Sequence, residues 1–140
     1  MIDFKVAVGK RLLLVDDDIQ QLEWRTLVLN MSGFAVIPAC SPLEAMSIMA
    51  QQPAYQVDVA VLDYHMPVMN GCVLADYLKS RYPDLKIILH SGTVEIPENE
   101  MSSVDVFVPK SDGIGTLLAQ VSEFAQIRPT THCAVIAREA

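Results

Sequence analysis

The sequence is poor in the features that mark several large classes of protein. It has three cysteines in 140 residues, Cys40, Cys72 and Cys133, and no C-x-x-C pair. We therefore expect reduced thiols rather than a disulfide framework. No apolar run reaches the length of a membrane-spanning helix, and Lys5 and Lys10 interrupt the apolar residues at the start, unlike a signal peptide. These absences predict a cytoplasmic protein with no membrane partner.

Basic residues are also scarce. Lysine and arginine number 10 against 17 aspartates and glutamates, which gives a net charge of −7. Because phosphate contacts require a basic patch, this balance argues against direct nucleic-acid binding. No internal linker is visible, and a chain of this length with 51% hydrophobic residues suits one globular domain. We expect a lead-in over residues 1–9, a domain over 10–126 and a tail over 127–140 with a small apolar run, Cys133–Ala137.

Short apolar runs alternate with helix-type patterns along the chain. The predicted strands cover residues 12–15, 34–37, 57–62, 86–90 and 104–108. The predicted helices cover residues 19–31, from 42 to before Pro53, 71–80, and a last one after residue 112. Residues 93–103 are weakly patterned, so any helix there is short. This alternation predicts an α/β fold in which helices cover both faces of a parallel five-stranded sheet.

Particular residues mark where the helices begin. Ser41, Pro42 and Glu44 stand in the order typical of a helix start, with a capping hydroxyl, a proline in the first turn and a glutamate three residues on. Ser111 or Asp112 is the expected cap of the last helix. The first helix is expected to pack its apolar residues on the sheet: Ile19, Leu22, Trp24, Leu27, Val28 and Met31.

Polar side chains follow four of the five predicted strands. Asp16 and Asp17 come after the first strand, Asp63 after the third, Ser91 after the fourth and Lys110 after the fifth. The carboxyl ends of parallel strands share one edge of the sheet, where α/β proteins bind ligands. Carboxylates 4 Å apart repel by about 4 kcal/mol per pair at an effective dielectric near 20, so such a cluster needs a cation. Taken alone, an aspartate after a strand is more often a helix cap, but the whole set predicts a Mg²⁺ and phosphate site.

The chain resembles a known family at these positions. The matching stretches are Leu13-Leu14-Val15-Asp16-Asp17, Leu62-Asp63-Tyr64-His65-Met66-Pro67 with Asn70-Gly71, Ser91-Gly92, and Phe107-Val108-Pro109-Lys110. They are similar to the CheY-like receiver domains of two-component response regulators, over about residues 10–126. The resemblance implies a flavodoxin-like (βα)5 doubly wound sheet of order 2-1-3-4-5. The interval between Ser91 and Phe107 is shorter than usual in the family, which implies a short or irregular fourth helix. Ser111 stands where the family usually has proline.

The resemblance also implies a reaction and a cofactor. Asp63 would be the phosphoacceptor, taking a phosphoryl group from a histidine kinase or a phosphotransfer protein. Asp16, Asp17 and Asp63 would hold Mg²⁺ together with the backbone carbonyl of His65, whose side chain we expect to face solvent. Chemistry of this kind is limited to self-phosphorylation and self-dephosphorylation, so the chain would be a switch and not an enzyme.

Three further residues would belong to the switch by the same resemblance. Lys110 would pair with the phosphoryl group, Ser91 would contact it on activation, and Phe107 would change rotamer. These changes would alter the face of the fourth and fifth strands, which would then bind an output protein whose identity the sequence does not indicate. A homodimer could also form on phosphorylation.

Three alternatives compete with a stand-alone switch. The chain could be a receiver fragment of a larger regulator or hybrid kinase. It could be a phosphatase of the haloacid-dehalogenase type, in which Asp16 of an Asp16-x-Asp18 signature is the nucleophile, although the later acidic pair and the cap domain of that family are not found. It could be a flavodoxin-type flavin-binding domain, but three aspartates after the first strand would repel the flavin phosphate.

Overall fold

The structure, a computed structural model, describes residues 10–51, 56–93 and 95–127. The predicted lead-in and the apolar run Cys133–Ala137 lie outside these residues. The elements in chain order are β1 (Arg11–Val15), α2 (Ile19–Met31), β2 (Ala35–Ala39), α3 (Pro42–Ala50), β3 (Val59–Leu62), α4 (Gly71–Arg81), β4 (Lys86–Ser91), η1 (Glu98–Glu100), β5 (Val106–Pro109), η2 (Lys110–Asp112) and α5 (Ile114–Ile127).

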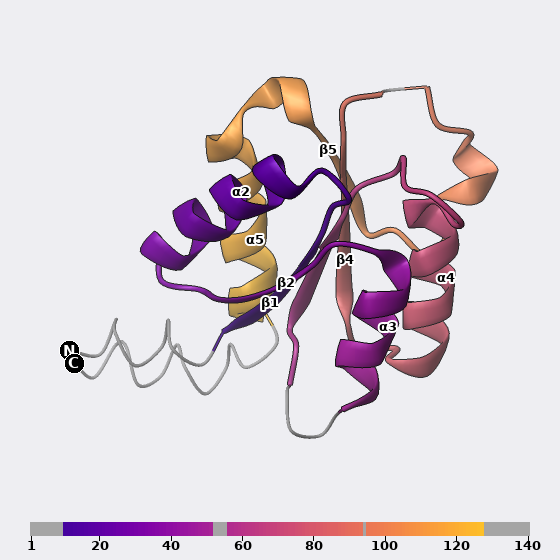
Figure 1. Ribbon diagram of the computed structural model, residues 1–140, viewed down its shortest axis with the longest axis horizontal. Coiled ribbons are helices and arrows are strands. Elements are labelled where there is room, and N and C mark those ends of the chain that lie inside the picture. The colour runs from indigo at the N-terminus through magenta and orange to yellow at the C-terminus, as the bar shows by residue number, and fades with distance from the viewer. Residues whose placement is uncertain (1–9, 52–55, 94, 128–140) are drawn as a thin grey trace.

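The five strands form one parallel sheet. Its order is β2-β1-β3-β4-β5, which confirms the predicted topology. The register pairs Leu13 with Ala60, Ala60 with Ile87, and Leu89 with Phe107. Helices α2 and α5 cover one face of the sheet, and α3 and α4 cover the other (Figure 1). All strands run the same way, so their carboxyl ends share one edge.

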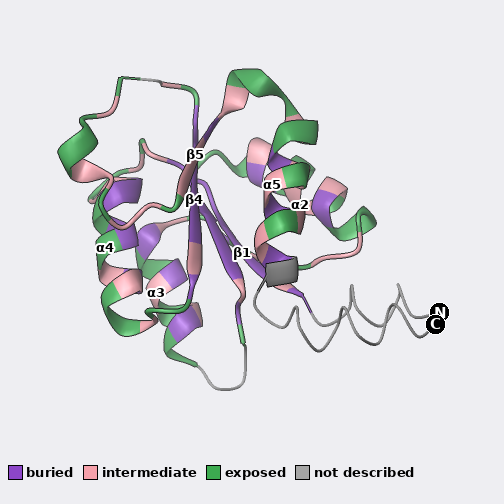
Figure 2. Cartoon of the chain, turned by 180° about the vertical axis from the view of Figure 1, so that it is seen from behind, coloured by how far each residue is buried: buried purple, intermediate pink, exposed green. Residues whose placement is uncertain are grey.

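Residues of the central strands are buried (Figure 2), and their side chains pack into a core on each face of the sheet. In β1, Leu13 and Val15 point to the core under α3 and α4, whereas Leu12 and Leu14 point to the core under α2 and α5. This is the period-2 alternation of a strand, and two buried faces explain the unbroken apolar run in the sequence. Burial of one such leucine contributes about 1.5–3 kcal/mol.

The inward face predicted for α2 is wrong in part. Leu22 is buried as expected, but Trp24, Leu27 and Met31 are 53%, 57% and 78% exposed. At 3.6 residues per turn these three residues lie opposite the stripe formed by Leu22 and Leu29. Ile19 is also exposed. The apolar residues of this helix lie on several of its sides, so composition alone does not indicate which side packs on the sheet.

The predicted start of α3 is confirmed. Ser41 Oγ accepts a hydrogen bond of 3.1 Å from the Glu44 backbone N–H, and Glu44 Oε1 accepts one of 2.6 Å from the Cys40 N–H. These two reciprocal bonds resemble a capping box, except that Glu44 accepts from the residue before the cap, and they satisfy two backbone donors at the start of the helix. Pro42 occupies the first turn, where its missing N–H has no intrahelical partner to lose.

Removal of this cap should weaken the fold measurably. The Ser41→Ala variant is expected to lose about 1 kcal/mol of unfolding free energy, because the Glu44 N–H loses its acceptor. Urea titration followed by circular dichroism measures the change. Ser47→Ala, an exposed position in the same helix, is the matched control and should lose nothing, since alanine has the higher helix propensity. Equal losses in both variants would contradict the capping role.

The fold differs from the sequence predictions at three boundaries. β2 extends through Pro38 to Ala39, which is tolerated because β2 is an edge strand and needs no N–H on its open side. β5 begins at Val106 rather than 104. Neither Ser111 nor Asp112 adjoins α5, because both lie in η2 and Gly113, with φ of +87°, separates them from the helix. Among the described residues between β4 and β5 the helical structure is η1 alone, which confirms the short fourth helix.

Candidate functional site

Three carboxylates meet at the carboxyl edge of the sheet. Asp16, Asp17 and Asp63 each offer one oxygen, and these atoms lie within 4.8 Å of one another. The backbone places two of them, because the Asp16 N–H donates to the Ala39 carbonyl at 3.1 Å and the Asp63 N–H donates to the Val15 carbonyl at 3.0 Å. The predicted convergence of the acids is therefore found. A few hard oxygen ligands around an open space fit a Mg²⁺ ion that keeps several waters.

Lys110 brings a positive charge to these acids. Its Nζ lies 3.2 Å from Asp16 Oδ2 and 3.2 Å from Asp63 Oδ1. The lysine begins η2 directly after β5, so the sheet delivers it to the same edge as the acids. The side chain of Asp16 is buried and that of Asp63 nearly so, so solvent screens these pairs less than it screens pairs at the surface.

Two residues of α2 that were not predicted from the sequence also belong to the site. Arg25 Nη1 lies 3.3 Å from Asp16 Oδ2 and donates to Gln21 Oε1 at 2.8 Å. The same Gln21 oxygen accepts from Lys110 Nζ at 2.9 Å. Their spacing could have indicated this, because residues four apart lie on one face of a helix, and this helix begins beside Asp16.

The site perturbs two titratable groups. Burial raises the pKa of the Asp63 carboxyl, the Lys110 ammonium opposes that shift, and the Asp16 carboxylate adds to it. Burial, followed by the charges of Arg25 and Lys110, lowers the pKa of His90 from 6.5 to about 3. Burial and the neighbouring acid make the ionised form of Asp63 costly, and a bound cation would stabilise that form.

Comparison with known proteins identifies the family. The family model described as the response regulator receiver domain matches residues 12–122. The chain belongs to this family. The match covers the acids, Ser91 and Lys110, so it includes every element that contributes to the site.

The relatives of this receiver domain are signalling proteins. It is 32% identical over 117 residues to the sensor kinase CckA of Brucella abortus, an alignment of 81% of this chain and 12% of the kinase. It is 33% identical over 90 residues to the photosynthetic apparatus regulatory protein RegA of Cereibacter sphaeroides, which covers 64% of this chain and 47% of RegA. The chain thus spans less than half the length of these relatives.

A solved structure similar to this receiver domain contains magnesium. The response regulator TrrA of Thermotoga maritima, solved in complex with Mg²⁺-BeF, superposes with a TM-score of 0.76 and 26% sequence identity, over 82% of this chain and 98% of TrrA. A second structure shows TrrA in complex with the histidine kinase ThkA, with a TM-score of 0.73 over 82% of this chain and 97% of that one. In the described part of the present receiver domain, no helix has the length and apolar character to cross a membrane.

Ser91 and Phe107 lie on one face of the receiver sheet. Ser91 is buried at the end of β4, and its Oγ accepts from the Thr93 N–H at 3.3 Å. Phe107 is half-buried, lies opposite Leu89 in the register and packs against the core under α3 and α4. Because strand side chains alternate, Ser91 shares this face with Leu89 and Phe107.

The loop after β3 is tied to the β4–β5 connection. The Tyr64 hydroxyl, one residue after Asp63, donates to Glu100 Oε1 in η1 at 2.8 Å. His65 is exposed, as expected, with its ring 4.9 Å from that of Tyr64 at an angle of 77°. The first residue beyond the acid is therefore linked to the segment that replaces a regular fourth helix.

The same loop contains a strained residue. Val68 has φ of +77°, and the Met69 N–H donates to the Pro67 carbonyl at 2.9 Å across it. This is a γ-turn of the less favourable hand. A β-branched residue in this region costs on the order of 1–3 kcal/mol, which the surrounding structure must offset.

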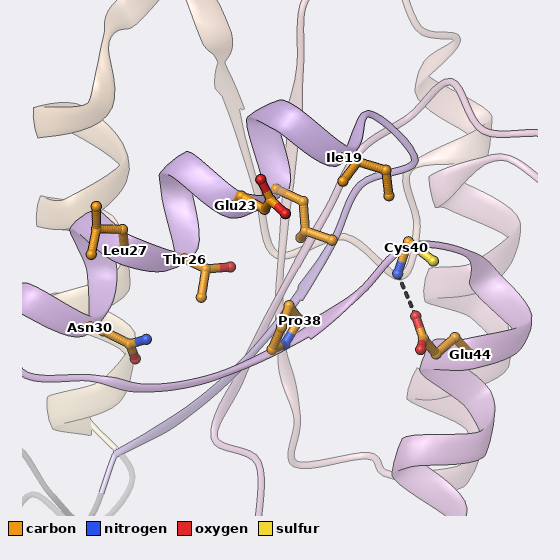
Figure 3. A pocket seen from close by; sticks show the side chains of 9 residues that line it. Ile19, Glu23, Thr26, Leu27, Asn30, Pro38, Cys40 and Glu44 are labelled. Atoms are coloured by element: carbon orange, nitrogen blue, oxygen red, sulfur yellow. Dashed lines mark hydrogen bonds between the residues drawn. The ribbon is translucent and has the colours of Figure 1, made fainter.

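A shallow hollow lies between α2 and the edge strand β2, where Ile19, Leu27 and Pro38 form an apolar lining beside Cys40 and Glu44 (Figure 3). None of the three clustered carboxylates lines it. The adjacent Glu44 raises the pKa of the Cys40 thiol, so the thiol stays protonated and weakly reactive at neutral pH.

The other described cysteine behaves alike. Burial raises the pKa of Cys72 to about 11. Cys40 and Cys72 are both free thiols, in agreement with the sequence prediction for these two, and Cys133 lies outside the described residues.

The buried His90 should give the receiver domain a distinctive pH dependence. Its folded-state pKa of about 3 lies below its ordinary 6.5, so the unfolded chain binds the proton first. The contribution of this histidine to the free energy of unfolding is fully present above pH 6.5. It is lost as the pH falls toward 3, by at most about 1.4 kcal/mol per pH unit. His90→Val should flatten this part of the curve, measured by urea unfolding between pH 4.5 and 7.5. Parallel curves for the two proteins would contradict the assignment.

Proposed function

We propose that this receiver domain is a phosphorylation-gated signalling switch of a two-component phosphorelay. Asp63 accepts a phosphoryl group from a histidine kinase or phosphotransfer protein in the presence of Mg²⁺. The observation that carries the proposal is the cluster of three carboxylates with the Lys110 ammonium 3.2 Å from the Asp63 oxygen. The family match and the complexes of TrrA with Mg²⁺-BeF and with ThkA support it.

The residues supply what transfer to a carboxylate needs. An Asp63 oxygen attacks phosphorus, a new O–P bond forms, and the bond from phosphorus to the donor breaks with its electron pair leaving on the donor. Lys110 offsets the repulsion between the attacking carboxylate and the phosphoryl oxygens. Mg²⁺, held by Asp16, Asp17, Asp63 and the backbone carbonyl of His65, would neutralise charge that develops on those oxygens.

Phosphorylation would then bias one face of the sheet. The acyl phosphate at Asp63 offers new acceptors to Ser91 and Lys110. Ser91 and Phe107 share the face toward α3 and α4, so inward movement of the serine leaves space that the half-buried Phe107 ring can fill. The β4–β5 face would change by a shift of populations and bind an output protein or a second copy of the chain.

The geometry disfavours the alternative phosphatase mechanism. Asp16 Oδ2, the nucleophile in that mechanism, is within 3.3 Å of both Arg25 and Lys110. Two cations on one carboxylate oxygen stabilise its lone pairs and reduce its nucleophilicity. Asp63 contacts Lys110 alone of the two cations. Because the chain spans only part of its relatives, we retain the proposal that it acts as the receiver portion of a larger regulator or hybrid kinase.

Intact-mass measurement with a small acyl phosphate donor tests the function. The wild-type chain should gain one phosphoryl group with Mg²⁺ and none with an excess of chelator. Asp17→Asn should require a higher Mg²⁺ concentration for the same gain, by about tenfold or more, because a hard cation loses one of its few anionic ligands. Phosphorylation that proceeds equally in the chelator would contradict the metal site.

A further inference from the structure

Gln21 connects the two cations of the site. Its Oε1 accepts from Arg25 Nη1 at 2.8 Å and from Lys110 Nζ at 2.9 Å, and its Nε2 donates to Asp18 Oδ2 at 3.1 Å. Both ends of the carboxamide are therefore engaged, and two cationic donors fix which end is the oxygen. This arrangement points the lysine at Asp63 and leaves its side chain little freedom.

Arg25 acts on the acids directly. Its side chain is 12% exposed, its Nη1 contacts Asp16 Oδ2, and its Nε is buried without a hydrogen-bond partner. A guanidinium that leaves one donor unsatisfied is held here by the charge of the site. Its charge also contributes to the lowered pKa of the buried His90.

The net charge of the cluster shows how Arg25 would affect the binding of a metal ion. Three carboxylates and two cations, Lys110 and Arg25, leave one net negative charge. A divalent cation would therefore enter a site whose charge is already largely compensated, and it would compete with a guanidinium and an ammonium group for Asp16 Oδ2. Once the Asp63 carboxylate is replaced by an acyl phosphate with two negative charges, the metal and both cations balance the two remaining acids and the phosphoryl group.

We propose that Gln21 and Arg25 are positioning residues of this site, where Gln21 holds the Lys110 ammonium beside Asp63 and Arg25 lowers the affinity for Mg²⁺ while stabilising the phosphorylated form. The inference rests on the proposed function in its second half, since it concerns the same phosphoryl transfer. Neither residue touches the reacting atoms in the structure, and both act through Lys110 and Asp16.

Two measurements on the full chain test the proposal. Calorimetric titration with MgCl₂ should show that Arg25→Met binds Mg²⁺ at least about threefold more tightly, because a nearby positive charge is removed. Phosphorylation by an acyl phosphate at saturating Mg²⁺ should nevertheless slow by about tenfold in Arg25→Met and in Gln21→Ala. In Gln21→Ala, Lys110 loses its orientation toward Asp63, and in Arg25→Met, a charge that stabilises the phosphorylated form is removed. Tighter metal binding combined with slower transfer distinguishes positioning from damage to the fold, which would weaken both.

Control variants complete the design. Arg25→Lys keeps the charge and should stay near the wild-type Mg²⁺ affinity. Gln20→Ala changes the same residue type at the exposed neighbouring position of α2 and should match wild type in both assays. Unchanged or weaker Mg²⁺ binding in Arg25→Met, or a wild-type rate in Gln21→Ala, would overturn the proposal. If the wild-type chain is not phosphorylated at all, the proposed function fails instead, and the calorimetry still decides the role of Arg25.

Discussion

The Asp63→Asn variant is expected to gain no phosphoryl group from an acyl phosphate donor under conditions that phosphorylate the wild-type chain fully. The carboxamide nitrogen and oxygen are poor nucleophiles toward phosphorus, and the substitution removes one of the three carboxylates of the candidate Mg²⁺ site. The expected loss is complete within detection by intact-mass spectrometry. Retention of the gain would show that another residue is the phosphoacceptor.

The same variant should fold well. Burial raises the pKa of Asp63, so its ionised form is costly to bury, and asparagine has nearly the same shape without the charge. Lys110 keeps its contact with Asp16. The free energy of unfolding should therefore be close to that of wild type. Asp76→Asn, which makes the same change at an exposed position of α4, is the matched control and should be phosphorylated normally.

The Gly71→Ala variant is expected to lose about 3 kcal/mol or more of stability, together with most of its phosphorylation. A Cβ at this position would overlap the backbone carbonyl oxygen of Asp63 and lie 2.9 Å from Leu89 Cδ1. The obstacle is mainly backbone, which cannot rotate away as a flexible side chain can. The Gly71 N–H also donates to the Tyr64 carbonyl at 2.9 Å, so any shift of the glycine moves the residues next to Asp63.

A second glycine provides the control for this experiment. Gly115 lies in the first turn of α5, and a Cβ there would have no atom within 4 Å. Gly115→Ala should stabilise the chain by about 0.5–1 kcal/mol, because alanine loses less conformational entropy in a helix. Thermal unfolding and the intact-mass assay measure both variants side by side. Wild-type stability in Gly71→Ala would mean that the close approach of α4 to Asp63 is not required.

Much of the fold followed from local patterns in the sequence. The apolar runs predicted the strands because a strand buried on both faces, such as β1 or β3, consists mainly of apolar residues. Ser41 and Glu44 predicted the start of α3 because a capping box involves residues only three positions apart. The interactions that decide these features are short-range or depend only on burial, so they are visible without the tertiary structure.

The inward side of α2 could not be predicted in the same way. Trp24, Leu27 and Met31 are apolar but exposed, and Leu29 is the residue buried with Leu22. The choice of face depends on how the helix lies against β1 and β2, which is a property of the packed sheet. The cap predicted for α5 was also wrong. The 3-10 helix η2 extends through Asp112, and Gly113, with its positive φ, stands between η2 and the start of α5.

The sequence by itself determined which chemical groups reach the carboxyl edge of the sheet. Parallel strands that end on Asp16, Asp63 and Lys110 must bring those residues to one edge, whatever the details of packing. Only the tertiary structure decided what surrounds them: Gln21 and Arg25 enter from α2, and Gln21 bridges Arg25 and Lys110. These features depend on distances between elements far apart in the chain, and a linear pattern carries no information about such distances.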